Sequence, residues 1–361
     1  LGDVYKRQFG ISAWLAGLGG VIWAFSSYFF ILIPAGHIWK FVTLAYIPPT
    51  IAGVVLAYRK KYLLGGIVTA LFIALQIQSN HIQMSYYFMF VILFFVGAYF
   101  EDAYKKKELP HFFKASGVLA LAAVVGVCIN ISNLYHTYEY SKETMRGKSE
   151  LKQEGAAASQ TSSGLDRDYI TNWSYGIGET LTLLVPNVKG GGSGSTMSQS
   201  EAAMAKANPM YNGIYSQLPQ YFGEQPWTAG PVYVGAFVMF LFVLGCFIVK
   251  GPLKWALLGA TIFSILLSWG KNFMGLTDFF IDYVPMYNKF RAVSSILVIA
   301  EFTIPLLAIF ALKEILSKPD MLKQEKNCRG VIAALVLTAG VALILAVAPG
   351  TFFSSFITTQ E

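Results

Sequence analysis

The chain has 361 residues, of which 55% are hydrophobic and only 13% are charged, whereas about a quarter of the residues in an average soluble domain are charged. This composition excludes an ordinary soluble enzyme and predicts a membrane protein. The formal net charge of +7 does not indicate a nucleic-acid partner, because the cations gather in the short loops of one face, where membrane topology places them.

The predicted fold is all-α, a polytopic transmembrane helical bundle of about nine spans. Residues 1–8, "LGDVYKRQ", lack the order of regions found in a signal peptide, and we expect a non-native tail. Nine apolar runs then recur, each close to the length that crosses about 30 Å of hydrocarbon. They are Phe9–Phe29, Trp39–Tyr58, Tyr62–Gln78, Met84–Phe100, Ala115–Leu134, Pro231–Val249, Pro252–Trp269, Ala292–Leu312 and Val331–Pro349.

These runs divide the chain into five transmembrane helices over 9–134, a large loop domain over 135–230, and four further helices over 231–349. Residues 350–361 are expected to begin an outer segment that is truncated. Fourteen of the 27 Lys and Arg residues lie in the loops after the second, fourth, sixth and eighth spans. By the positive-inside rule those loops are cytoplasmic, and the 135–230 domain is extracytoplasmic.

Polar side chains from separate hairpins are predicted to meet at the outer ends of the spans. His37 follows the first span, and the tight turn "SNHIQ" between the third and fourth spans carries Asn80, His81 and Gln83. Lys289 and Arg291 precede the eighth span, against the topological charge bias. A guanidinium group there suits a phosphate, through its planar fork of donors. The alternative is an interfacial anchor whose charged head reaches out of an aromatic belt.

Glu301 and the membrane prolines break the pattern of a simple anchor. Glu301 lies ten residues past Arg291, about 15 Å below the outer end of the span, and Pro305 removes the usual donor to its carbonyl. A carboxylate at this depth is costly unless it is protonated or paired. We expect either a cavity-lining functional group or a protonated glutamate hydrogen-bonded to a neighbouring helix. Pro48 similarly predicts a kink in the second span.

The loop domain carries candidate carboxylates and a glycine-rich stretch. Glu179 is an outward carboxylate able to act as a base or a metal ligand. The stretch "GGGSGS" lacks the Gly-Lys-Ser/Thr ending of a phosphate-binding loop, so we expect a flexible hinge. No His/Cys cluster has the spacing of a zinc site, so no metal ligands are assigned, and a requirement for a divalent metal is left open.

Four motifs taken together resemble a known family. In order, "GHIWKFVTLAYIPP", "SNHIQMSYY", "WSYGIGETLTLLVPNVKGG" and "VPMYNKFRAVSSILVIAE" resemble the YfhO family of bacterial multi-spanning membrane proteins, over residues 9–361. That family is similar to the GT-C class of glycosyltransferases. The resemblance implies a GT-C-like fold in the bacterial cytoplasmic (inner) membrane, among membrane lipids. It also implies transfer of a sugar from a polyprenyl-phosphate donor to an envelope glycan or polymer at the outer face.

The resemblance also implies roles for individual residues. Arg291 and Lys289 would hold the lipid phosphate, and Glu179 would be an acid of the reaction. His37, Lys40, His81 and Gln83 are carried over as further substrate-binding positions, and Asn80 and Glu301 are added to them from the residue pattern alone. Because the family's main catalytic acid lies in a first outer loop, this chain is expected to be a fragment that lacks it. The alternative function is a lipid or polysaccharide translocator, with Glu301 and the broken helices lining a path through the bilayer; a non-catalytic scaffold is a third.

Overall fold

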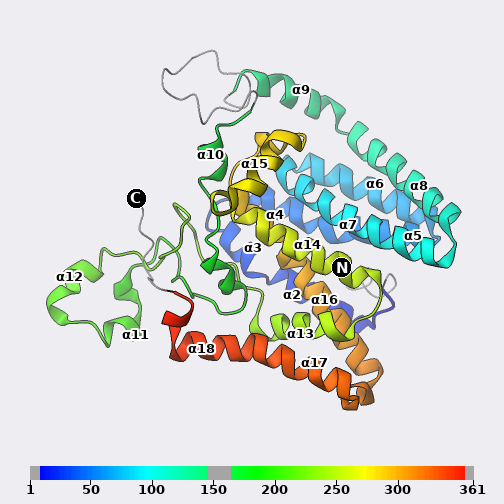
Figure 1. Ribbon diagram of the computed structural model, residues 1–361. Helices are drawn as coiled ribbons and strands as arrows, with labels where there is room; N and C mark the ends of the chain where they lie inside the picture. The colour runs from blue at the N-terminus through cyan, green and yellow to red at the C-terminus, as the bar shows by residue number, and fades with distance from the viewer. Residues whose placement is uncertain (1–8, 145–163, 354–361) are drawn as a thin grey trace.

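The computed structural model describes residues 9–144 and 164–353 of the chain. Within these ranges the fold is all-helical without a β-strand, and a single isolated bridge joins Thr196 to Pro219. Apolar helices form a bundle, and the segment 164–235 lies against one end of it as a mainly irregular region with short helices (Figure 1). The predicted class, an all-α helical membrane protein, is therefore confirmed.

Six helical segments among the described residues are long and apolar enough to cross a membrane. They are α2 with α3 (Ala13–Ala24, Ser27–Leu32), α4 with α5 (Ile38–Ala45, Ile47–Tyr58), α7 (Ile82–Lys106), α8 (Leu109–Cys128), the segment Val293–Ser317 that contains α16 (Val298–Ser317), and the segment of α17 and α18 (Glu325–Leu335, Val341–Val347). A seventh is possible if α14 (Pro252–Ser268) and the segment Gly270–Tyr283, which contains α15 (Met274–Tyr283), count as one span bent by 110°.

The predicted count of nine spans is not confirmed. Two of the expected spans are apolar helices of 17 and 13 residues, α6 (Tyr62–Gln78) and α13 (Ala236–Ile248). Helix α6 coincides with its predicted span, whereas α13 begins five residues after the predicted start at Pro231; both are apolar but shorter than the six segments above. The predicted fifth span is also displaced, since α8 ends at Cys128 and a separate helix, α9 (Ile131–Lys142), follows it.

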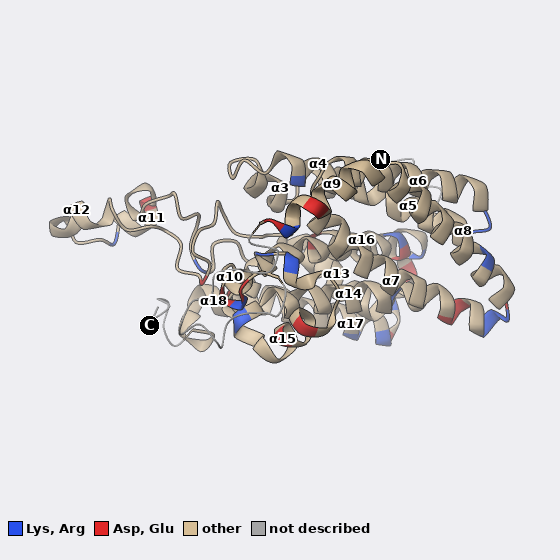
Figure 2. Cartoon of the chain, turned by 90° about the horizontal axis from the view of Figure 1, so that it is seen from above, with Lys and Arg blue, Asp and Glu red and all other residues tan. Residues whose placement is uncertain are grey.

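Helix α16 forms the centre of the bundle. Its residues from Val298 to Ala311 are all buried, because the sequence there is apolar around the whole circumference of the helix. Helices α2, α13 and α14 pack around it. Charged residues instead gather at helix ends, as where α7 and α8 meet (Figure 2). Arg291, two residues before the segment Val293–Ser317, contacts Tyr169 of the loop region.

Close packing of α5 against α6 depends on two glycines. A Cβ atom at Gly53 would lie 2.4 Å from Thr69 Oγ1, and one at Gly65 would lie 2.5 Å from the backbone nitrogen of Ala57. Small residues at such crossings let helix backbones approach, which is the main source of helix association in lipid. This crossing places the outer end of α6, and hence the turn into α7, next to α4.

Most of the loop region is tied down rather than hinged. The Arg167 guanidinium pairs with both Asp278 and Asp282 of α15, and the backbone nitrogen of Leu165 donates to Asn288 O at 3.0 Å. The expectation of a flexible hinge at "GGGSGS" is wrong. A Cβ at Gly190 would lie 1.6 Å from Gln220 O, and Ser193 N donates to Thr228 O at 2.8 Å. These glycines allow two stretches of backbone to pack face to face.

We predict that Gly65→Ala destabilises the protein, because the new methyl group meets backbone atoms of α5 that cannot rotate away. The expected loss is about 1–3 kcal/mol, in the range of overpacked sites, and it exceeds the small gain in helix propensity. Thermal unfolding in detergent measures it. The matched control is Gly17→Ala in α2, where the added Cβ meets nothing within 4 Å; an equal effect of both changes would contradict the packing argument.

Candidate functional site

A cavity of about 370 Å³ opens where the loop region meets the ends of α3, α4 and α7. Five of the predicted site residues line it together: His37, Lys40, His81, Gln83 and Arg291. They come from three hairpins and are separated by up to 254 positions in the chain, as the residue numbers 37 and 291 show. The structure thus gathers the polar groups of the GHIWK, NHIQ and NKFR motifs at one cavity, which we name the cationic cavity.

Lys40 forms the floor of the cationic cavity. Its side chain is buried, with 8% of the residue exposed, and Nζ donates to Ser295 Oγ at 3.2 Å. Among the residues that the structure describes, no carboxylate lies within ion-pair distance of this ammonium group. An unpaired buried charge is costly, so such groups are normally paired. The position of Lys40 therefore favours an anionic ligand.

Arg291 lies at the mouth of the cavity, where aromatic side chains hold it. Nη1 donates to the Tyr169 hydroxyl at 2.6 Å, and the guanidinium carbon lies 5.3 Å from the Tyr169 ring centroid and 5.7 Å from that of Trp173. These cation–π contacts orient the group without neutralising it. Gln83 Nε2 donates to Arg291 O at 2.7 Å and to the Tyr87 hydroxyl at 2.9 Å. Gln83 is thus a positioning residue for Arg291.

The two histidines are neutral components of the cavity. Burial, and then the neighbouring Lys40 ammonium, lowers the pKa of His81 to about 4. Burial, with Lys40 and Arg291, also lowers the pKa of His37. His81 Nδ1 is buried and has no hydrogen-bond partner among the described residues, so it is available to a ligand. Lys40 and Arg291 are consequently the cationic side chains of the lining, and no Asp or Glu in the described ranges lines the cavity.

Asn80 and Lys289 do not line the cavity, contrary to the expectation for both. Asn80 has a left-handed backbone, with φ of 56°, and its side chain is exposed at the turn between α6 and α7. Asparagine adopts that conformation more readily than most residues, so its role is to reverse the chain. Lys289 is the last residue of the short helix Tyr287–Lys289, two residues before Arg291, which lines the cavity.

Glu301 also lies outside the cavity lining, which along this segment ends at Leu297. The residue is 1% exposed, and its Oε2 accepts a hydrogen bond from Ser26 Oγ, between α2 and α3. Oε1 is buried without a partner in the described part of the chain. Of the two alternatives stated for this residue, the geometry matches a glutamate hydrogen-bonded to a neighbouring helix rather than a substrate-binding group.

Glu179 faces a different pocket, and its oxygens are already occupied. Oε2 accepts from the backbone nitrogens of Gly176 at 2.7 Å and Glu224 at 3.0 Å, and Oε1 accepts from the Tyr221 hydroxyl at 2.5 Å. Burial raises the pKa of Glu179, against these hydrogen bonds, which lower it. The carboxylate organises the loop, so it is not positioned as a base in the cationic cavity.

Several residues of the cavity were not predicted from the sequence. Trp173 and Trp227 form part of its wall, joined by a hydrogen bond of 3.2 Å from Trp173 Nε1 to Trp227 O, and Ser295 and Tyr28 lie on its floor. The tryptophans of "TNWSYG" and "EQPWTAG" in the loop region were the available signal. Loop aromatics far apart in sequence do not reveal by themselves that they face the same space.

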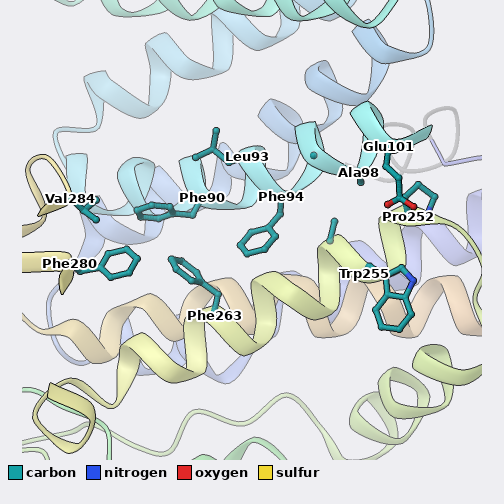
Figure 3. Close-up of a pocket in the computed structure, with 12 residues that line it drawn as sticks. Phe90, Leu93, Phe94, Ala98, Glu101, Pro252, Trp255, Phe263, Phe280 and Val284 are labelled. Atoms are coloured by element: carbon teal, nitrogen blue, oxygen red, sulfur yellow. The ribbon is translucent and has the colours of Figure 1, made fainter. Parts of the chain in front are cut away.

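A separate apolar groove of about 500 Å³ runs between α7 and α14 (Figure 3). The rings of Phe90, Phe94, Phe263 and Phe280 point into it, and Glu101 and Trp255 lie toward its other end. Tyr86 connects the groove to the cavity mouth. Its ring centroid lies 5.3 Å from that of Phe90 and 5.1 Å from that of Phe290, which precedes Arg291.

Comparisons of the chain with family models, with curated proteins and with solved structures find no match. The resemblance to the YfhO family therefore stays a prediction based on the four motifs.

We predict that acid destabilises the fold partly through His81. Its folded-state pKa of about 4 lies below the ordinary 6.5, so the unfolded chain takes up the proton first, and stability present above pH 6.5 is lost as pH falls toward 4. The expected contribution is roughly 1–2 kcal/mol between pH 7 and 5. His81→Asn should reduce this pH dependence of unfolding, whereas the exposed control His136→Asn should not; equal slopes for all three proteins would refute the assignment.

For Glu301 we predict that Gln is tolerated and Leu is not. Glu301→Gln keeps an acceptor for Ser26 Oγ and has nearly the same volume, so the unfolding temperature should change little. Glu301→Leu leaves the buried Ser26 hydroxyl without this partner, at a cost of about 1–3 kcal/mol. Unfolding of both variants in detergent checks this, and strong destabilisation by Gln would instead indicate that the fold requires a charged carboxylate.

Proposed function

We propose that the cationic cavity binds the phosphate of a lipid-linked sugar, and that the chain belongs to a membrane glycosyltransferase acting at the outer face of the membrane. The observation that carries the proposal is a buried ammonium group and a guanidinium group in one cavity without a lining carboxylate. Charge-assisted hydrogen bonds to phosphate oxygens are the strong interactions that such a pair makes. The location at the ends of apolar helices allows the headgroup to bind while the lipid tail stays in the bilayer.

Each residue then has a role that follows from its position. Lys40 binds a phosphate oxygen from the floor, and Arg291 offers its donor fork from the mouth. His81 and His37, neutral at pH 7, are suited to hydrogen bonds with sugar or phosphate oxygens. During transfer the anomeric carbon–oxygen bond to phosphate breaks and an acceptor oxygen forms the new glycosidic bond. The cations stabilise the departing lipid phosphate.

The general base of this reaction is a residue other than Glu179. The acceptor hydroxyl must lose a proton, and Glu179 is held by three internal donors outside this cavity. In the family that the motifs resemble, the catalytic carboxylate lies in the first outer loop. The apolar groove between α7 and α14 supports the lipid part of the proposal, because aromatic rings link it to the residue before Arg291.

The translocator alternative receives less support from the geometry. A translocator needs a polar path through the bilayer, and Glu301 was the residue expected to line it. Instead Glu301 pairs with Ser26, and the α16 residues on both sides of it are buried and mostly apolar. The polar groups that do meet lie at one end of the bundle.

The test is binding of a 20-carbon isoprenyl phosphate to the purified protein in nanodiscs. We predict that Lys40→Met and Arg291→Ala each weaken binding by about 10- to 100-fold, since a charged hydrogen bond contributes about 1.5–3 kcal/mol. Lys318→Ala, an exposed cation at the end of α16, is the matched control and should have no effect. The isoprenyl alcohol without phosphate should bind all four proteins equally weakly. Unchanged affinity in both cavity variants would refute the phosphate site.

A further inference from the structure

A second pocket adjoins the cationic cavity and differs from it in containing carboxylates. Its volume is about 360 Å³, within the usual range of small-molecule sites. We name it the acidic pocket; its lining includes Gly176, Gly178, Glu179, Lys189, Glu224 and Phe353. The wall between the two spaces is very thin. Tyr175 and Gln225 line the cationic cavity. Their chain neighbours, Gly176 and Glu224, line the acidic pocket.

Glu224 is the carboxylate of this pocket with an oxygen left to use. Its Oε2 accepts from Asn272 Nδ2 at 2.7 Å, which holds the side chain in place. Its Oε1 has no hydrogen-bond donor in the part of the chain that the structure describes. In contrast, both oxygens of Glu179 accept hydrogen bonds, from Gly176 N, Glu224 N and the Tyr221 hydroxyl, and these bonds fix the shape of the wall. The pocket therefore offers a positioned acceptor.

Lys189 provides the complementary donor. The residue is 7% exposed, and Nζ lies 4.6 Å from the centroid of the Phe353 ring. Burial lowers the pKa of Lys189, whereas the charges of Glu179 and Glu224 raise it. A carboxylate oxygen and an ammonium group thus face one space that is closed on one side by an aromatic residue from the far end of the described chain.

Glycines keep the pocket open. A Cβ at Gly176 would lie 2.9 Å from Glu179 Oε2 and 3.0 Å from Glu224 Oε1, and one at Gly178 would lie 2.7 Å from the Phe353 ring. Side chains at these positions would fill the space between the carboxylates and the aromatic ring. Residues of the motif "YGIGET" therefore line this pocket, and we assign them a structural role rather than a catalytic one.

We propose that the acidic pocket is a saccharide-binding site and takes the acceptor glycan. A sugar ring presents adjacent hydroxyls that both donate and accept, which matches Glu224 Oε1 beside the Lys189 ammonium. Its less polar face suits the aromatic wall. These contacts alone support saccharide binding in the pocket. The assignment of that saccharide as the acceptor rests on the proposed function and on the nearness of the cationic cavity.

The experiment is saturation-transfer NMR on the protein in nanodiscs, with a trisaccharide of N-acetylglucosamine and a trisaccharide of glucose as probes. We expect at least one probe to give a transfer signal. Glu224→Gln and Lys189→Met should each weaken its binding about tenfold or more. Glu201→Gln, an exposed carboxylate of the same loop region, is the matched control and should leave binding unchanged. Unfolding temperatures show whether the variants stay folded.

Other outcomes overturn the inference in distinguishable ways. No signal with either trisaccharide, or a signal insensitive to both pocket variants, refutes the saccharide site. A signal abolished by millimolar calcium, with calcium binding lost in Glu224→Gln, reassigns the pocket to a cation. Isoprenyl phosphate binding is measured on the same samples: if it persists while saccharide binding fails, the proposed function survives without this site. Saccharide binding without phosphate binding would leave the pocket but remove its assignment to the acceptor.

Discussion

Polar groups at membrane depth must find their partners inside the protein, because hydrocarbon offers none. The described bundle follows this constraint closely. Ser26 meets Glu301, Thr261 meets Thr303, and Asn130 Nδ2 donates to Ala74 O. Lys40 differs from these groups, because its buried ammonium group donates to the Ser295 hydroxyl and has no carboxylate within ion-pair distance among the described residues. The absence of a carboxylate partner for this ammonium group in the described ranges supports the proposed anion site.

The loop region supplies part of the lining of both the cationic cavity and the acidic pocket. Arg167 fixes one edge of it to α15, and Glu179 fixes the stretches around residues 176 and 224 to each other. Between these two attachments the chain passes Trp173 and Tyr175, so that one face closes the cationic cavity and the other forms the acidic pocket. Under the proposed function, these two adjacent spaces would bring an anionic donor and a hydroxyl-bearing acceptor close together.

Much of the bundle was predictable, and the errors have identifiable causes. Hydropathy located nearly all the apolar helices, because burial or lipid contact demands long apolar runs whatever the neighbours are. Its count of nine spans is not confirmed, because hydropathy does not show where a helix ends, as at Cys128, or bends, as between α14 and α15. For the site, Lys40 and His81, which belong to separate motifs, line one cavity. For Glu301 the sequence left two alternatives open, and the contact with Ser26 matches the second of them.

What the sequence by itself determined is the class of protein and the set of polar residues near one end of its helices. Both follow from local physics: hydrocarbon selects apolar runs, and polar or charged residues are confined to their ends. Only the tertiary structure decided which of those residues share a cavity, that Glu179 belongs to a separate pocket, and that "GGGSGS" is packed rather than hinged. Those outcomes depend on contacts between segments that are distant in the chain, such as Gly190 against Gln220, and no local pattern encodes them.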